Sequence, residues 1–322
     1  MSIQVSVVVP TFKRPDLLQR CLEALMAQDF DPAAYEVIVA DDAASAETEA
    51  VVQAQAAVAA PRLRYLAVTG QHGPAAARNQ GWQAAEGAII AFTDDDCLPE
   101  PDWLRAGVAA FEAEVAGVSG RVIVPLPASP TDYERDAAGL EQTEFVTANC
   151  FYRREALAAV GGFDERFTAA WREDSDLFFA LLARGSRLAY APAARVVHPV
   201  RPARWGVSLS QQRKSFFNAL LYKKHPDFYR QYIQAGPPGH YYSILAALGL
   251  AFSGVMGRCR WLALGATGVW LFLTGRFCRR RLRHNSRALS HVSEMVVTSA
   301  LIPPLAVFWR IWGALKFRVV FF

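Results

Sequence analysis

The sequence has few cysteines, and their spacing matches no common metal or redox motif. Five of them are scattered through 322 residues, and no two form a Cys-x-x-Cys pair (Cys21, Cys97, Cys150, Cys259 and Cys278). This pattern favours a reducing compartment. No apolar leader comes before the first strand pattern, which starts at Val5, so we expect the N-terminal body to stay in the cytosol.

Two glycine-rich phosphate-binding loops are also missing. A dinucleotide-binding oxidoreductase would carry Gly-x-Gly-x-x-Gly after its first strand, but residues 10–14 here read Pro-Thr-Phe-Lys-Arg;. No Walker-type Gly-x-x-x-x-Gly-Lys-[Ser/Thr] segment occurs either. A bound phosphate must therefore be held by a metal ion and side chains.

Acidic residues are nearly absent from the last quarter of the chain. Residues 241–322 hold eleven Lys and Arg but a single acid, Glu294, whereas the first 240 residues carry a net charge of −6. Because the basic residues of this tail are interleaved with long apolar runs, the tail predicts contact with anionic membrane lipids and no nucleic acid.

The tail contains three apolar segments, at 241–257, 261–277 and 292–315. The first two are near the short limit for spanning a bilayer, and they predict a tight hairpin that spans or dips. Pro303-Pro304 should kink or split the third. A hydrophobic dimerisation module would explain the apolar residues but not the arginine cluster at 279–283.

A basic and aromatic stretch, residues 211–234, precedes these segments. It fits either helices lying along a membrane surface or a helix pair capping the catalytic domain. The predicted organisation is a catalytic domain at 1–205, a helical linker at 206–240 and membrane-associated helices at 241–322.

Strand and helix patterns alternate through the first 200 residues. Strands are predicted at Val5–Thr11, Tyr35–Asp42, Leu63–Leu66, Ala88–Phe92, Val118–Val124 and from Arg187;. Thr147–Arg154 is identified as a further strand by its resemblance to the family described below. Helices are predicted at Asp16–Gln28, Ala46–Ala59, after Gly73-Pro74, Glu155–Val160 and Leu177–Arg184. This alternation predicts an α/β fold with a doubly wound, mostly parallel sheet.

Three carboxylates, Asp94, Asp95 and Asp96, follow the apolar run at 88–92. Ligands bind at the carboxyl ends of strands in open α/β sheets. Adjacent carboxylates repel one another, so a divalent cation carrying a substrate phosphate is a natural counter-charge. The alternatives are a solvated acidic turn or a helix N-cap, because Pro99–Leu104 reads as the start of a helix.

Six motifs occur in an order that resembles family 2 glycosyltransferases, which have the glycosyltransferase A-type fold. They are Val8–Thr11, Val39–Asp42, Gly73–Asn79, Asp94–Asp96, Gly161–Glu165 and Glu173–Leu177. Together they span roughly residues 5–200. Each motif is weak alone, but their shared order supports the resemblance.

The resemblance implies a nucleotide-diphosphate sugar donor at the ends of the first strands. Pro10, Thr11 and Arg14 would line the nucleotide pocket, and Asp41 would accept hydrogen bonds from the base. Helix capping is the alternative for Asp41 and for its neighbour Asp42. Arg78 would reach the diphosphate or the carboxylates, and its alternative is a structural ion pair with the same acids.

The resemblance also implies a metal site. Asp94 would contact the ribose or the metal, Asp96 would coordinate Mg²⁺ or Mn²⁺, and Asp95 would lie on the donor side. His198 would be a further ligand or, alternatively, a hydrogen-bonded structural residue. Asn149 would touch the donor sugar or the acceptor.

An inverting transfer needs a carboxylate that removes the proton of the acceptor hydroxyl. By resemblance this base is Asp174. Its alternative role is to cap the helix predicted from Leu177, although Ser175 or Asp176 could provide that cap instead.

These features predict a metal-dependent, inverting glycosyltransferase at the cytoplasmic face of the inner membrane, anchored by its C-terminal region. Its acceptor would be a glycan or a lipid-linked intermediate of envelope glycan or glycolipid biosynthesis. One alternative is a processive polysaccharide synthase, disfavoured because Arg201 replaces the Gln of Gln-x-x-Arg-Trp. The other is a catalytically silent protein that binds sugar nucleotides.

Overall fold

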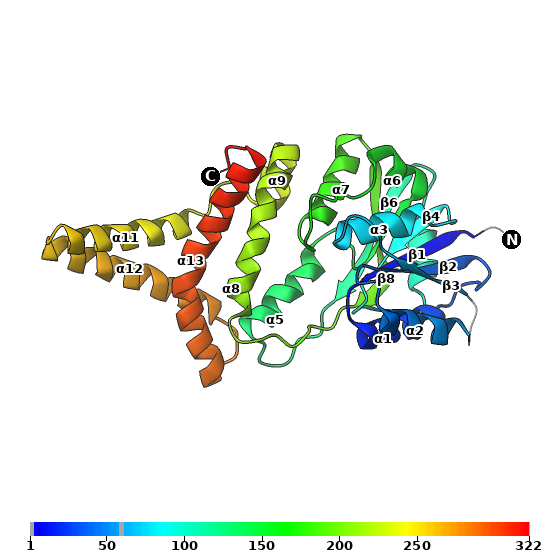
Figure 1. Ribbon diagram of the computed structural model, residues 1–322, viewed down its shortest axis with the longest axis horizontal. Coiled ribbons are helices and arrows are strands. Elements are labelled where there is room, and N and C mark those ends of the chain that lie inside the picture. Colours follow the sequence, from blue (N-terminus) through cyan, green and yellow to red (C-terminus); the bar gives the residue numbers. More distant parts are fainter. Residues whose placement is uncertain (1–2, 58–60, 322) are drawn as a thin grey trace. The chain divides into compact units, whose positions relative to one another are not determined.

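The computed structural model describes residues 3–57 and 61–321. The chain forms two compact units (Figure 1). The first comprises Met1–Pro125 and Ala138–Val200, and the second comprises Leu126–Ala137 and Arg201–Phe322.

An eight-stranded sheet with the order β3-β2-β1-β4-β7-β6-β8-β5 forms the centre of the first unit. Four parallel strands make one half: β1 (Val5–Thr11), β2 (Tyr35–Asp41), β3 (Arg62–Ala67) and β4 (Ile89–Phe92). The other half is mixed: β5 (Leu98–Pro99), β6 (Val115–Ile123), β7 (Cys150–Arg153) and β8 (Arg187–Val197). Strand β7 is antiparallel to β4 and β6, β8 is parallel to β6, and β5 is antiparallel to β8. The predicted doubly wound, mostly parallel sheet is confirmed.

Helices cover both faces of this sheet, which is why its central strands are continuous apolar runs. Figure 1 shows α1 (Pro15–Met26) and α2 (Ala46–Ala56) on one face and α3 (Pro74–Gln83) on the other. The side chains of β1 alternate between the two layers. Val5, Val7 and Val9 pack with the core on the α1 side, whereas Val8 faces Gly81 of α3 so closely that a Cβ there would clash;.

The remaining elements of the first unit are α4 (Trp103–Ala109), a 3₁₀ turn (Ala138–Gln142), α6 (Arg154–Val160) and α7 (Glu173–Ala183). Two predicted boundaries are wrong here. The segment from Pro99 does not open a helix, because Leu98–Pro99 pairs with β8 and α4 begins only at Trp103. The helix expected from Leu177 begins four residues earlier, at Glu173. The predicted helix 46–59 extends to Ala56, and residues 58 and 59 lie outside the described residues.

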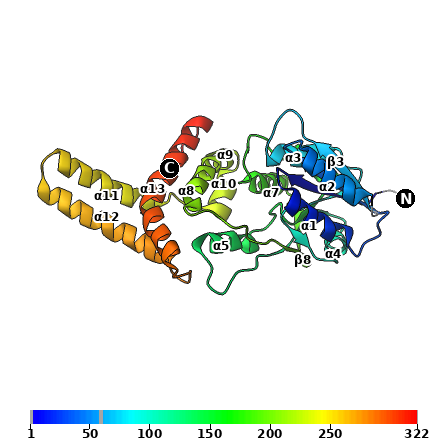
Figure 2. The same ribbon diagram turned by 60° about the horizontal axis from the view of Figure 1, so that its bottom comes forward.

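The second unit contains three long apolar helices: α11 (Gly239–Met256), α12 (Arg260–Arg281) and α13 (Leu289–Phe317). Figures 1 and 2 show α11 and α12 running side by side as a hairpin. All three helices are long and apolar enough to cross a membrane;. The predicted split of the third segment is wrong, since α13 runs through Pro303 and Pro304. Burial of Ile302 against Ile244 and Phe277 offsets the backbone hydrogen bonds that the prolines remove;.

Short helical segments connect the sheet unit's last strand to this hairpin. They are α8 (Val207–Gln211), a 3₁₀ turn (Gln212–Ser215), α9 (Phe216–Lys224), α10 (Pro226–Phe228) and a π-turn (Tyr229–Ile233). Helix α9 packs along α13 so tightly that a side chain at Gly313 would collide with the carbonyl of Phe216. The second unit also includes α5 (Asp132–Ala137), which the sequence analysis did not identify as a helix.

Candidate functional site

The acidic turn lies directly after β4, at the carboxyl end of the parallel half of the sheet. Thr93 donates from its hydroxyl to the carbonyl of Ala148 (3.0 Å), which fixes the end of the strand. The turn closes when the amide of Cys97 donates to the carbonyl of Asp94 (3.1 Å). Asp94, Asp95 and Asp96 are therefore held on a short, well-defined loop.

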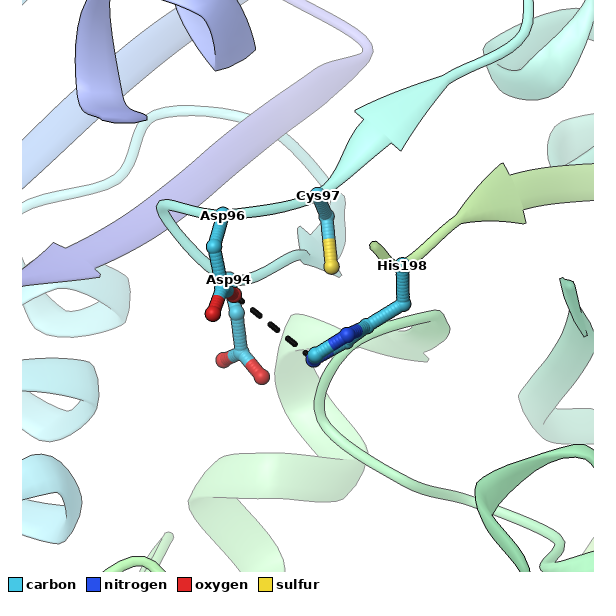
Figure 3. Close-up of side chains that lie close together, drawn as sticks. All are labelled: Asp94, Asp96, Cys97 and His198. Carbon is cyan, nitrogen blue, oxygen red and sulfur yellow. Dashed lines mark ion pairs between the residues drawn. The ribbon is translucent and has the colours of Figure 1, made fainter. Parts of the chain in front are cut away.

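Four side chains around this turn could hold a metal ion: Asp94, Asp96, Cys97 and His198 (Figure 3). Their ligand atoms all lie within 4.8 Å of one another. His198 follows β8, and its amide donates to the carbonyl of Ile123 (2.8 Å). Its Nε2 lies 3.6 Å from Oδ1 of Asp96. The structure thus brings together all three residues that the sequence analysis named as metal ligands.

Cys97 was not among the predicted site residues, although it directly follows the acids. Burial raises the pKa of its thiol well above the ordinary value, and Asp94 and Asp96 act in the same direction. A neutral thiol is a poor ligand for a hard cation. The carboxylates of Asp94 and Asp96 and the imidazole of His198 form a donor set that fits Mn²⁺ or Mg²⁺.

Asp95 points away from this cluster, toward two of the predicted nucleotide-pocket residues. Thr11 donates from its hydroxyl to Oδ2 (2.7 Å), and Arg14 donates to Oδ1 (2.9 Å). Burial raises the pKa of the Asp95 carboxyl, while Arg14 and Thr11 oppose that shift. Asp95 therefore fixes the end of β1, where Pro10 precedes Thr11, relative to the acidic turn.

Arg78 joins the acidic turn to α7. Its guanidinium donates to Oδ1 of Asp94 (2.8 Å) and to Oε1 of Glu173 (3.0 Å), and the side chain is buried. Burial alone would lower the pKa of Arg78, but Asp94 and Glu173 reverse the effect and raise it above its ordinary value. The structure thus shows Arg78 in ion pairs with Asp94 and Glu173, and its predicted contact with the diphosphate stays a prediction.

Glu173 is a site residue that the sequence analysis missed. Burial raises the pKa of its carboxyl to about 7, and the neighbouring Asp174 adds to the shift while Arg78 opposes it. Glu173 is the first residue of the Glu-Asp-Ser-Asp motif, and this motif was the sequence signal that could have identified it as a site residue. Its burial against Arg78, 95 positions earlier, could not be read from that motif.

Asp174 lies in the first turn of α7 and is partly buried. Its Oδ1 accepts a hydrogen bond from the amide of Ser175 (2.6 Å). The N-cap residue of α7 is Arg172, and no side chain caps this helix. Neither Asp174 nor its suggested replacements Ser175 and Asp176 is the cap.

Asp41 and Asp42 organise the loops after β2. The carboxylate of Asp41 is fully buried and accepts from the amides of Ala43 (2.9 Å) and Ser45 (2.7 Å) and from the hydroxyl of Tyr65 (3.0 Å). Asp42 accepts from the amide of Gly73 (3.0 Å). Neither acid caps α2, because the Ser45 hydroxyl does so. The contact of Asp41 with a base stays a prediction.

Asn149 is fully buried, and all of its side-chain polar groups are used. Its Oδ1 accepts from the indole of Trp103 (2.8 Å), and its Nδ2 donates to the carbonyls of Arg121 and Ala194 (both 2.9 Å). These bonds tie β6, β7 and β8 together. The predicted contact of Asn149 with the donor sugar or acceptor is not among them and stays a prediction.

Two family models match the chain. The model described as Glycosyl transferase family 2 matches residues 6–163, and the model described as Glycosyl transferase family group 2 matches residues 89–312, which is more than half of the chain. Glycosyltransferase AglE of Haloferax volcanii is 30% identical over 210 residues, covering 62% of this chain and 67% of AglE. The pre-mycofactocin glycosyltransferase of Mycobacterium tuberculosis is 28% identical over 301 residues, covering 87% of this chain and 58% of that protein. The chain thus spans about two thirds or less of the length of these curated relatives.

The fold is also similar to that of a solved glycosyltransferase. The mannosyltransferase PcManGT of Pyrobaculum calidifontis, in complex with GDP-Man and Mn²⁺, aligns with a TM-score of 0.57 at 20% identity. The alignment covers 99% of this chain and 88% of that one. This likeness shows a shared fold.

Proposed function

This chain belongs to glycosyltransferase family 2, and on that premise we propose that it transfers a sugar, with inversion, from a nucleotide-diphosphate donor to an acceptor hydroxyl. One observation carries the proposal. Asp94, Asp96 and His198 lie in one cluster at the carboxyl end of the sheet, and Arg78 links that cluster to the helical turn that holds Asp174.

Asp94, Asp96 and His198 would hold the divalent ion, Mg²⁺ or Mn²⁺. When bound, such an ion supplies positive charge that stabilises the departing nucleoside diphosphate. Two hard carboxylates and one imidazole suit both ions and leave coordination positions for phosphate oxygens. Arg78 keeps Asp94 oriented and supplies a buried positive charge beside it.

The donor nucleotide would lie against the ends of the first strands. The buried Asp95 accepts hydrogen bonds from Thr11 and Arg14 there and so holds the end of β1 in a fixed position;. Pro10 and Asp41 complete our assignment of the nucleotide pocket, and Asn149 supports the sugar side from within the sheet. Rigid positioning of this kind lowers the entropic cost of reaching the transition state.

Asp174 would act as the general base. It takes the proton of the acceptor hydroxyl while that oxygen forms a bond to the anomeric carbon, and the bond from this carbon to the diphosphate oxygen breaks. The electron pair leaves with the nucleoside diphosphate. The hydrogen bond from the Ser175 amide holds one oxygen of Asp174 and orients the other.

The acceptor would be a glycan or a lipid-linked intermediate of envelope glycan or glycolipid synthesis. Support comes from residues 241–322, whose helices carry the apolar length for membrane association and an excess of arginine;. We assign residues 1–205 to the catalytic domain and 206–240 to a helical linker, and we place the protein at the cytoplasmic face of the membrane.

The test is release of nucleoside diphosphate by the purified chain. Uridine, guanosine and thymidine diphosphate sugars are each supplied with Mn²⁺ and an extract of membrane glycolipids. We expect one donor to give release that requires both the metal and the extract. Asp16→Asn, an exposed acid on α1, is the matched control and should release as much as the wild type. Absence of release from every donor contradicts the proposal.

A further inference from the structure

The second unit contains a segment that is separated in sequence from the rest of it, residues 126–137. Arg281, at the end of α12, holds this segment by donating to Oδ2 of Asp132 through Nη2 (2.7 Å) and Nε (3.1 Å). The same guanidinium donates to the hydroxyl of Thr298 on α13 (2.6 Å), and Arg281 is buried. Arg135 adds a bond to the side chain of Asn285 (2.6 Å). A buried, multiply bonded arginine thus fixes α5 against the apolar helices.

Beside this arrangement lies an open cavity of about 270 Å³. Its walls are residues 131–134, 201–204, 207 and 208, and the first turns of α13, which provide His291, Glu294 and Met295. A second, more open pocket of about 570 Å³ adjoins it, shares Tyr133, residues 201–204 and Val207, and adds Trp205. Together they have the size of a small-molecule site.

His291 is the feature that indicates a ligand. It is 4% exposed, and among the described residues neither of its ring nitrogens has a hydrogen-bond partner. Oε2 of Glu294 lies 3.9 Å from Nδ1, which is longer than a hydrogen bond;. Proteins seldom leave a buried imidazole without partners, because the desolvation is not compensated. An apolar residue would serve packing better at this position.

The charges around the cavity are mixed, which argues against a site for a simple anion. The lining includes Arg201 and Arg204 together with Asp132, Glu134 and Glu294. Asp132 is already paired with Arg281, and Glu134 accepts from the amide and hydroxyl of Thr131 (2.6 and 2.9 Å). Oε1 of Glu294 accepts from the amide of Gly206 (2.7 Å). The cavity therefore offers both donors and acceptors, the complement that vicinal hydroxyl groups require.

Trp205 supplies an aromatic surface beside these polar groups. The side chain is half exposed, and its indole N–H donates to the carbonyl of Ser290 (3.2 Å), which fixes the ring in place. An aromatic ring next to mixed donors and acceptors suits the apolar C–H face and polar rim of a pyranose. We propose that the cavity binds a sugar residue of the acceptor or product glycan, with His291 and Trp205 as binding residues. The identification with acceptor or product rests on the proposed glycosyltransferase function.

The test uses the full chain in detergent, without nucleotide or metal, and saturation-transfer NMR with methyl glycosides of common hexoses and N-acetylhexosamines. We expect at least one glycoside to bind. His291→Leu should weaken that binding by about tenfold, as expected when a buried hydrogen bond is lost. The same variant should have a higher Tm, because it removes an unpartnered buried imidazole. Trp205→Leu should also weaken binding. Trp261→Leu, an exposed tryptophan of α12 outside the cavity lining, should not.

Other outcomes overturn the proposal. The first is the absence of binding by every glycoside, and the second is binding that survives both His291→Leu and Trp205→Leu. The third is displacement of the signal by inorganic phosphate or by vesicles of anionic lipid, because the cavity would then be an anion site. Failure of the proposed function is distinguishable from these results. Glycoside binding that depends on His291 in a protein that releases no nucleoside diphosphate would refute the transfer reaction and leave the carbohydrate site standing.

Discussion

Replacing Arg78 with Met tests whether one buried guanidinium holds the two halves of the candidate site together. In the native chain it bonds to Asp94 at 2.8 Å and to Glu173 at 3.0 Å. The side chain of Glu173 is 3% exposed, whereas that of Asp94 is 27% exposed. Met has a similar length and fills the space, but it cannot pair with either acid. Water can screen Asp94 after the change, so most of the cost falls on Glu173.

The expected cost follows from the burial of Glu173. Removing one partner of a buried ion pair typically costs about 3–5 kcal/mol. Burial already raises the pKa of Glu173 from 4.5 to about 7 while Arg78 opposes the shift, so loss of Arg78 raises this pKa further. Above pH 7 the folded variant then keeps a proton that the wild type has released. The folding free energy of the variant, relative to wild type, should therefore become less favourable by up to about 1.4 kcal/mol per pH unit above that point.

Thermal unfolding at several pH values measures this difference. At pH 8 we expect the Tm of Arg78→Met to fall by roughly 10 °C, since about 1 kcal/mol corresponds to 2–4 °C in domains of this size. The fall should be smaller at pH 6, where Glu173 is protonated. Adding Glu173→Gln to the variant should recover most of the loss, because a neutral amide needs no cation. A loss that is equal at all pH values, or no recovery in the double variant, would show that Arg78 acts through packing alone.

The sheet could be predicted because its pattern is local. Val5–Thr11 and Tyr35–Asp41 are short, predominantly apolar and β-branched runs, a composition typical of strands covered on both faces;. Because ligands bind at the carboxyl ends of strands in such sheets, the strand pattern before Asp94–Asp96 pointed to the binding edge. The pairing of β4 with β1 could not be read from the chain order, since β4 follows β3 in the sequence. The clustering of His198 with these acids came from the family resemblance, since nothing near His198 in the sequence indicates its distance from Asp96.

The features that the sequence did not reveal depend on contacts between distant segments. In the sequence Glu173 resembles an ordinary acid near a helix start, and only the fold shows that it is buried against Arg78. The strand at Leu98–Pro99 is two residues long and exists only because β8 passes beside it. The prolines of α13 predict a kink or a split, but α13 is one continuous helix, and the adjacent Ile302 is buried against Ile244 and Phe277. The cavity at His291 is lined by segments far apart in the sequence, and Arg281 binds one of them through Asp132, 149 positions away.

Three further outcomes test the site and the membrane region. Asp96→Ala should lower transfer by at least about 100-fold, because it removes a residue that would hold the ion neutralising the departing diphosphate; turnover that survives both this change and EDTA would exclude a metal role. Asp174→Asn should leave donor binding intact while transfer falls roughly 10²–10⁴-fold, and loss of transfer in Asp176→Asn instead would move the base to that residue. The last outcome concerns topology. If the α11–α12 hairpin spans the bilayer, both of its ends lie on one side, and the six arginines at 276–287 outnumber the two at the turn. The positive-inside rule then places those ends, and the first unit, in the cytosol. Cys259 is exposed at the turn, so an impermeant thiol reagent should label it on intact cells. Labelling only after permeabilisation would mean that the hairpin dips into one leaflet, and labelling of Cys278 from outside would reverse the orientation.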